Sequence, residues 1–134
     1  MTALACQQAL DAAFRADPAV QATLGNPVRL LDAPIKLAAY PFAWWRRWET
    51  KPADAAEVRG EEHVATLEVV SRQSGVEVAR AAVEALSNCA TSMHPAVVGV
   101  RIILVLPLYC DVLRSTDGRS WLGIVRLKIV AEYI

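Results

Sequence analysis

The sequence carries no surplus of either charge. Its 134 residues include 14 Lys and Arg and 14 Asp and Glu, so the formal net charge at pH 7 is zero. Proteins dedicated to binding nucleic acid or anionic membranes normally carry a basic surplus, so this balance argues against both classes. Zero net charge also removes the repulsion that keeps proteins apart in solution. Together with 54% hydrophobic residues, it favours a chain that packs against partners.

Long hydrophobic runs are missing as well. The longest one, Ile102–Cys110, is interrupted by Pro107, whereas a membrane-spanning helix needs about 20 apolar residues. The first ten residues contain no basic residue and include Gln7 and Gln8, unlike a signal peptide. We therefore expect a chain that is made in the cytoplasm and has no membrane partner. The three cysteines are an odd number at wide spacings, which excludes a complete set of disulfides and fits reduced thiols.

The motifs of catalysis and metal binding are also absent. The sequence has no glycine-rich phosphate loop, no C-x-x-C pair and no H-E-x-x-H motif. His63 and His94 are the only histidines, and neither stands in a recognised catalytic or metal-ligand spacing. Glu61 and Glu62 are adjacent carboxylates, which point apart on a strand or loop and so do not form an acid/base pair. We expect no catalytic site, no metal site and no cofactor, and hence not an enzyme.

The apolar periodicity predicts a single domain over residues 1–134. An apolar residue every three or four positions is typical of a helix, and alternation is typical of a strand. Helices are predicted at 3–16, from Pro18 to about 24, and from about 77 to 90 behind the capping box Ser74-x-x-Glu77. Strands are predicted at 28–31, 42–50, 63–71, 97–113 and 121–134. The order predicts an α+β fold with a mainly antiparallel four- to five-stranded sheet and helices packed on one face.

Residues 51–62, KPADAAEVRGEE, combine six charged side chains with almost no large apolar ones. This composition predicts a long, solvated, charged loop. Loops of about a dozen residues are uncommon in compact domains and are often functional. We therefore take this segment as a candidate contact with a partner.

The segment 42–50, FAWWRRWET, is the most aromatic of the chain. On a strand, Trp44, Arg46 and Trp48 share one face, and Trp45 and Arg47 share the other. Three interpretations are open: a core strand with arginines at its rim, a protein interface, in which Trp and Arg are enriched, or a surface that stacks on single-stranded nucleic acid. The neutral net charge disfavours the third.

The predicted strand at 102–108 has no polar face. Either it is central and covered on both sides, or another subunit covers one side. The chain has enough apolar strand surface for two covered sheet faces but enough helix for only one. This imbalance predicts an oligomer.

Five segments in order along the chain resemble one protein family. They are ALDAAFRADPAVQATLG (9–25), VRLLDA (28–33), YPF (40–42), the strand-to-helix step 64–86, and GIVRLKIVAEY (123–133). This ordered set is similar to the tail-terminator, or tail-completion, proteins of siphovirus-type phages and of gene transfer agents. The WWRRW strand and the apolar stretch 102–109 depart from the commoner family pattern.

The resemblance implies a structural virion protein that is assembled in the cytoplasm of a host bacterium. Family members form a ring, usually a hexamer, that ends the tail tube at its head-proximal end. The implied partners are the major tail tube protein and the head-completion or stopper protein, with DNA passing non-specifically through the lumen. The residues predicted to contact subunits or partners are Trp44, Trp45, Arg46, Arg47, Trp48, Lys51, Asp54, Glu57, Arg59, Glu61 and Glu62.

Three other functions stay open from the sequence. Another small virion connector, such as a head-completion or tail-tube subunit, has a similar make-up. A small enzyme or ligand-binding domain and a nucleic-acid binder fit less well, because the chain lacks their motifs and charge.

Overall fold

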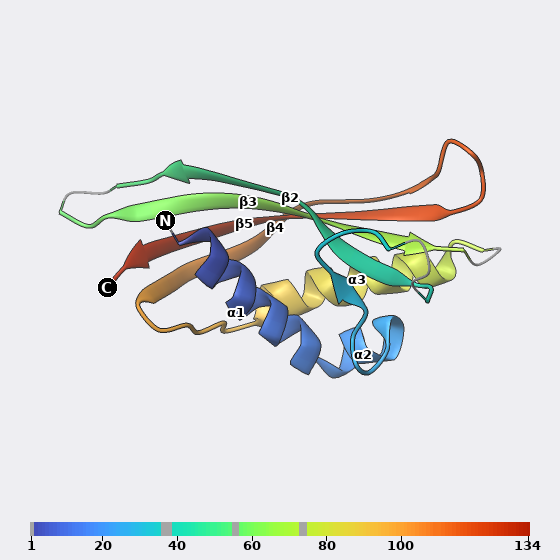
Figure 1. Cartoon of the computed structure of the whole chain (residues 1–134), viewed down its shortest axis with the longest axis horizontal. Helices are drawn as coiled ribbons and strands as arrows, with labels where there is room; N and C mark the ends of the chain where they lie inside the picture. Colours follow the sequence, from blue (N-terminus) through green and yellow to red (C-terminus); the bar gives the residue numbers. More distant parts are fainter. Residues whose placement is uncertain (1, 36–38, 55–56, 73–74) are drawn as a thin grey trace.

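The computed structural model describes residues 2–35, 39–54, 57–72 and 75–134. Within these residues, three helices and five strands form the fold (Figure 1). They are α1 (Ala3–Ala16), α2 (Pro18–Leu24), β1 (Leu30–Leu31), β2 (Phe42–Pro52), β3 (Gly60–Ser71), α3 (Glu77–Ser92), β4 (Val100–Arg114) and β5 (Trp121–Tyr133). Among these residues, no helix is long and apolar enough to cross a membrane.

The strands form one sheet in the order β1-β2-β3-β5-β4. Every neighbouring pair is antiparallel except β1 and β2, which run parallel. The predicted α+β class is confirmed, and the sheet is mixed because of the short strand β1. Figure 1 shows the helices on one side of a long, twisted sheet whose hairpin ends project beyond them. The opposite side of the sheet, called the open face below, has no helix over it.

The core lies between the helices and the sheet. Leu67 on β3 and Leu127 on β5 are fully buried, as are Leu10 and Phe14 on α1 and Leu86 on α3. Alternate residues of β5 are buried, from Val125 to Ala131, as expected for a strand with one covered face. The helical residues that meet them recur every three or four positions, which places them on one side of each helix.

Gly123 lets α3 approach β5 closely. A Cβ atom at this position would overlap Val83 Cγ2 and would lie 3.2 Å from Val69 Cβ. We expect Gly123→Ala to lower the free energy of unfolding by about 2 kcal/mol, because it overpacks a tight helix–sheet contact. Urea denaturation of Gly123→Ala with and without Val83→Ala tests this. Shortening Val83 should restore part of the loss, and no recovery would contradict the overlap.

The two predicted helix starts have different outcomes. At α2 the prediction is confirmed, since the Asp17 carboxylate accepts hydrogen bonds from Ala19 N and Val20 N. At α3 the capping box is wrong in register. The helix begins at Glu77, with Val76 at the N-cap and no side-chain cap hydrogen bond, whereas the box requires Glu77 to be the third helical residue. Ser74 lies outside the described residues.

The long charged loop predicted at 51–62 is wrong in extent. Lys51 and Pro52 end β2, and Gly60 to Glu62 begin β3. Only residues 53–59 connect the two strands, and the Ala53 N–H donates to the Gly60 carbonyl across the connection. The two strands run past the core, and their ends face solvent. The ends therefore carry charged side chains, and this composition led to the prediction of a loop.

Candidate interaction surfaces

A bulge in β2 changes which of its three tryptophans share a face of the strand. Trp45 pairs with Leu67, but Arg47 pairs with the adjacent residue, Thr66, so Arg46 is an extra residue in the strand. A bulge of this kind shifts the side-chain alternation by one residue. Trp48 therefore lies on the helix side with Trp45, 5.5 Å away between ring centroids, and the predicted sharing of a face by Trp44 and Trp48 is wrong.

The three tryptophans have three different environments. Trp45 is 7% exposed and packs against Phe14, with ring centroids 6.1 Å apart. Trp48 is partly buried against the core. Trp44 lies on the open face, where its indole N–H donates to Glu68 Oε1 at 3.1 Å. Trp45 thus belongs to the core, and only Trp44 is directed to the side without helices.

Two arginine side chains on the open face are held by ion pairs. Arg46 Nη1 lies 2.7 Å from Glu68 Oε2, and Arg47 Nε lies 3.3 Å from Glu49 Oε1. These two arginines, with Tyr109 and Arg126, line an open hollow of about 300 Å³ that also borders Thr66. Paired side chains of both signs give this surface no uniform charge, unlike a nucleic-acid platform.

Nearer to the β2–β3 connection, a further chain of ion pairs crosses the strands. Glu62 lies between Lys51, at 3.5 Å, and Lys128, at 3.2 Å. The hydrogen bond from Lys128 is the main reason that the pKa of Glu62 falls below its ordinary value. Arg101 and Glu132 form another pair at 3.0 Å. The charges in this part of the sheet compensate one another.

The remaining predicted site residues do not form one group. The Asp54 carboxylate accepts a hydrogen bond from Gly60 N, which helps to close the β2–β3 connection. Glu57 is exposed in that connection. Arg59 lies with its guanidinium 5.9 Å from the Tyr133 ring centroid. Glu61 is on the helix side, where the Thr2 hydroxyl lies 2.6 Å from its Oε1.

The side chain of His63 on β3 is fully buried. The indole N–H of Trp48 donates to Nδ1 at 3.0 Å, so Nδ1 carries no proton. The Thr50 hydroxyl also contacts Nδ1. Nε2 lies 2.9 Å from the Thr2 hydroxyl, which in turn contacts Glu61. Burial lowers the pKa of His63 below its ordinary value of 6.5, which keeps the ring neutral.

This network has a structural role. It joins the start of α1 to β2 and β3 through the side chains of Thr2, Trp48 and His63. Within the described residues, no group of three or more His, Cys, Asp or Glu side chains is arranged to hold a metal ion.

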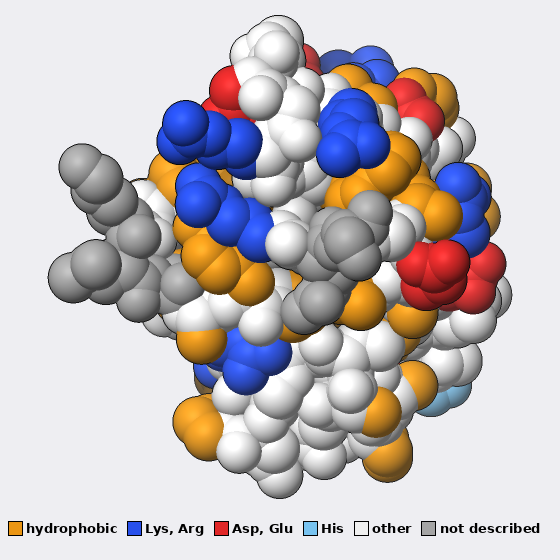
Figure 2. Space-filling view, turned by 90° about the vertical axis from the view of Figure 1, so that its right-hand side faces the viewer, with side chains coloured by type: hydrophobic (Ala, Val, Ile, Leu, Met, Phe, Trp, Pro, Cys, Tyr) orange, Lys and Arg blue, Asp and Glu red, His pale blue; other side chains and the backbone are white. Residues whose placement is uncertain are grey.

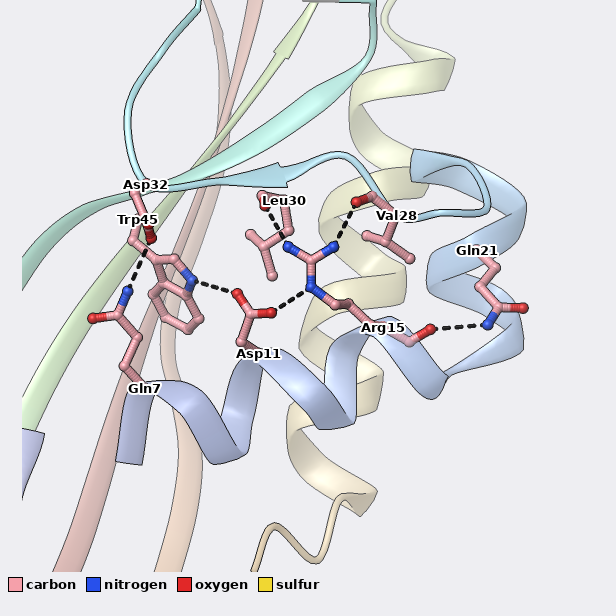
Figure 3. A network of polar contacts seen from close by, with 8 residues as sticks. All are labelled: Gln7, Asp11, Arg15, Gln21, Val28, Leu30, Asp32 and Trp45. Carbon is pink, nitrogen blue, oxygen red and sulfur yellow. Dashed lines mark hydrogen bonds and ion pairs between the residues drawn. The ribbon is translucent and has the colours of Figure 1, made fainter. Parts of the chain in front are cut away.

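A second polar network lies between α1 and the segment 28–32 next to β2 (Figure 3). Arg15 pairs with Asp11 and donates to the carbonyls of Val28 and Leu30, at 3.0 and 2.7 Å. Asp11 also accepts from the Trp45 indole at 3.3 Å. These contacts fix the segment before β1 against the helix. They border an open groove of about 440 Å³ along α1, in which Gln7 donates to Asp32 and Arg15 pairs with Asp11.

The most apolar exposed surface lies along β4. The sequence left two alternatives for this strand: a central strand covered on both faces, or a strand with one face covered by another subunit. The first alternative is wrong, because β4 is the last strand of the sheet. Residues from Ile103 to Leu113 include six large apolar side chains that are at least 40% exposed. They are Ile103, Leu104, Leu106, Leu108, Tyr109 and Leu113.

Two bulges and a proline shape this edge. The pairing of β4 with β5 shifts between Ile102 and Leu104 and again between Pro107 and Tyr109. Bulges and proline disfavour pairing with a further strand. The surface is therefore suited to contact through side chains rather than through a continued backbone ladder.

Comparison with known proteins identifies the family of the chain. A model of the family "Tail completion protein gp17" matches residues 8–132. The chain belongs to this family. It is a structural, tail-associated virion protein of the kind found in phages and gene transfer agents. Among the curated proteins, none matches the chain.

A solved structure supports the fold of this tail-completion protein. The chain is similar to one in the structure "Virion of native gene transfer agent (GTA) particle", with a TM-score of 0.82 and 20% identity. The match covers 94% of this chain and 93% of the other. The resemblance inferred from the sequence is thus confirmed at the level of the family.

Proposed function

We propose that this tail-completion protein forms a closed ring, usually a hexamer, that ends the tail tube at its head-proximal end. The ring joins the major tail tube protein to the head-completion or stopper protein, and DNA passes through its lumen without sequence-specific contact. The observation that carries the proposal is the exposed apolar side of β4 on a chain of this family. A ring needs such a surface, because each subunit offers one patch to a different patch of its neighbour.

The total exposed area supports association. The chain exposes 7561 Å², whereas a monomeric protein of 14.6 kDa exposes about 6,900 Å². The excess of roughly 650 Å² is close to the ~800 Å² that one partner contributes to a standard interface. Burying apolar area of this size favours association, although the ordering of the subunits offsets part of the gain.

The introduction of negative charge on β4 tests the ring. We expect the double variant Leu104→Asp/Leu106→Asp to weaken subunit association by about tenfold or more, because both carboxylates would be desolvated in the contact. Native mass spectrometry and light scattering over a concentration series measure the distribution of oligomers. Both side chains are exposed in the single chain, so its melting temperature should change little.

Leu4→Asp is the matched control. Leu4 is 70% exposed on α1, on the other side of the sheet, and its replacement should leave the oligomer distribution unchanged. A wild-type chain that stays monomeric at high concentration would contradict the ring. An oligomer that survives the double variant would place the subunit contact elsewhere.

A further inference from the structure

The end of the molecule that carries the β4–β5 turn has a distinct charge pattern. Figure 2 looks onto this end and shows Lys and Arg side chains set among apolar ones, with Asp and Glu side chains toward its margins. The arginine end, as we call it, consists of Arg29, Arg72, Arg114 and Arg119 with the aromatic rings of Tyr40 and Trp121.

Individual contacts place these residues together. The Arg72 guanidinium lies 5.0 Å from the Tyr40 ring centroid, and the Arg114 guanidinium lies 4.9 Å from that of Trp121. Trp121 pairs with Arg114 on one side and with Ser71 on the other. The end is thus a continuous surface across β3, β5 and β4.

The β4–β5 turn and the segment before β2 complete this surface. Hydrogen bonds from Ser115 and from the Arg119 backbone lower the pKa of Asp117, and the nearby charges of Arg119 and Arg72 contribute to the shift. Arg29 Nε donates to the Pro41 carbonyl at 2.7 Å, beside Tyr40. Both segments therefore bring arginine charge to the same end.

The charges at the arginine end lack carboxylate partners. None of its four arginines forms an ion pair with a described residue, whereas Lys51, Arg101 and Lys128 near the other end all do. Asp117 is the one carboxylate in the β4–β5 turn, and it is bonded within that turn to Ser115 and Arg119 N. The indole N–H of Trp121 is buried and has no acceptor among the described residues. The four arginines thus keep a positive charge that no described carboxylate neutralises at ion-pair distance.

From this arrangement we infer that the arginine end binds a carboxylate-rich surface of a neighbouring protein. Arginine offers a planar fork of donors that fits carboxylates, and stacking on an aromatic ring holds the fork in place. Arginine and aromatic residues are also the types that dominate protein interfaces. The inference is independent of the proposed ring, because another protein can bind this end whatever the number of subunits in the oligomer.

A polyanion such as DNA fits this end less well than a protein does. Nucleic-acid binding surfaces usually extend as a basic stripe along a face. Here the adjoining open face carries alternating pairs such as Arg46 with Glu68 and Arg47 with Glu49, and Asp117 stands within the cluster itself. A short acidic segment of a protein meets these four arginines without crossing that mixed surface.

The test measures binding of a fluorescein-labelled hexaglutamate peptide to the full chain by fluorescence anisotropy at low salt. We expect Arg72→Gln/Arg114→Gln to weaken binding by about fivefold or more, because both stacked guanidinium groups are lost. The matched control is Arg59→Gln/Arg126→Gln. It also removes two ring-stacked arginines that have no ion pair, over Tyr133 and Tyr109, and should weaken binding less than about twofold.

Each other outcome overturns the inference. Absence of peptide binding by the wild-type chain, or equal losses in the two double variants, shows that the arginine end is no specific site. Tighter binding of an equally labelled 12-base-pair DNA duplex that the same two substitutions abolish assigns the end to nucleic acid instead. Circular dichroism confirms folding of each variant, and native mass spectrometry of the same samples reports the ring separately.

Discussion

Replacing His63 with alanine is expected to lower the free energy of unfolding by about 3 kcal/mol. The substitution removes the acceptor of the Trp48 indole N–H and the ring nitrogen that contacts the Thr2 hydroxyl. Buried donors without acceptors cost about 1 to 3 kcal/mol each, and the space left by the ring adds to the loss. Urea denaturation followed by tryptophan fluorescence measures the change, with Trp48 beside the substitution as the reporter.

His94→Ala is the matched control for His63→Ala. His94 is exposed after the end of α3, and its replacement should change stability by no more than about 0.5 kcal/mol. Equal effects of the two substitutions would contradict the buried network. Should His63→Ala fail to fold, His63→Gln keeps one acceptor and one donor on the side chain and allows the comparison.

We expect the stability of the fold to depend on pH through the same histidine. The pKa of His63 lies below 6.5 in the folded protein because burial disfavours the charged ring. The unfolded chain therefore binds this proton first, and stability falls as the pH drops below about 6.5. Protonation of His63 Nδ1 would also remove the acceptor of the Trp48 indole N–H, so that two donors would face each other. We expect the wild-type stability to decrease between pH 7.5 and pH 5, and His63→Gln to remove most of that decrease.

Glu61 accounts for a separate part of the acid sensitivity. Burial alone would raise its pKa, but hydrogen bonds from Thr2 outweigh burial, and the pKa lies below the ordinary 4.5. The stabilisation by this carboxylate is present above that ordinary value and is lost as the pH falls through the lower, folded-state pKa. The titration of His63 between pH 7.5 and pH 5 is therefore measured while Glu61 stays ionised.

Apolar periodicity was sufficient to predict most of the elements, because the helices and β5 each bury one regular set of residues against a single core. The sequence pattern within one strand did not predict features that depend on how the strand pairs with its neighbour. The extra residue Arg46 exists only relative to the pairing of β2 with β3, and nothing in WWRRW marks it. The ends of β2 and β3 look like a loop because residues 51–62 are charged, yet their ion pairs form only across strands.

Only part of the candidate interaction surface could be predicted, because most of its residues are brought together by the fold. The excess apolar strand surface at 102–108 was visible from composition, and the structure places it on the edge strand β4. His63 carried no signal in the sequence, since its partners Thr2, Trp48 and Thr50 are brought together by the fold. The arginines of the arginine end come from three segments far apart in the sequence, with only Arg114 and Arg119 close together, so no local motif could group all four.

Trp45→Ala is expected to lower the free energy of unfolding by about 4 kcal/mol. The indole is nearly buried between Phe14 and Trp48, and removal of a large core aromatic ring costs about 3 to 5 kcal/mol. The substitution also removes the hydrogen bond to Asp11, which helps to hold α1 against the sheet. Urea denaturation at neutral pH measures the loss.

Trp44→Ala provides the comparison that tests the bulge in β2. Trp44 is partly exposed on the open face, and Glu68 keeps its ion pair with Arg46 when the indole is removed. We expect a loss of about 1 kcal/mol, the usual size for a partly exposed position. Equal losses at Trp44 and Trp45 would show that both indoles are covered alike, and would contradict a sheet with one open face. A large loss at Trp45 alone assigns this residue to folding, and leaves Trp44 and β4 as the apolar surfaces available to neighbouring subunits.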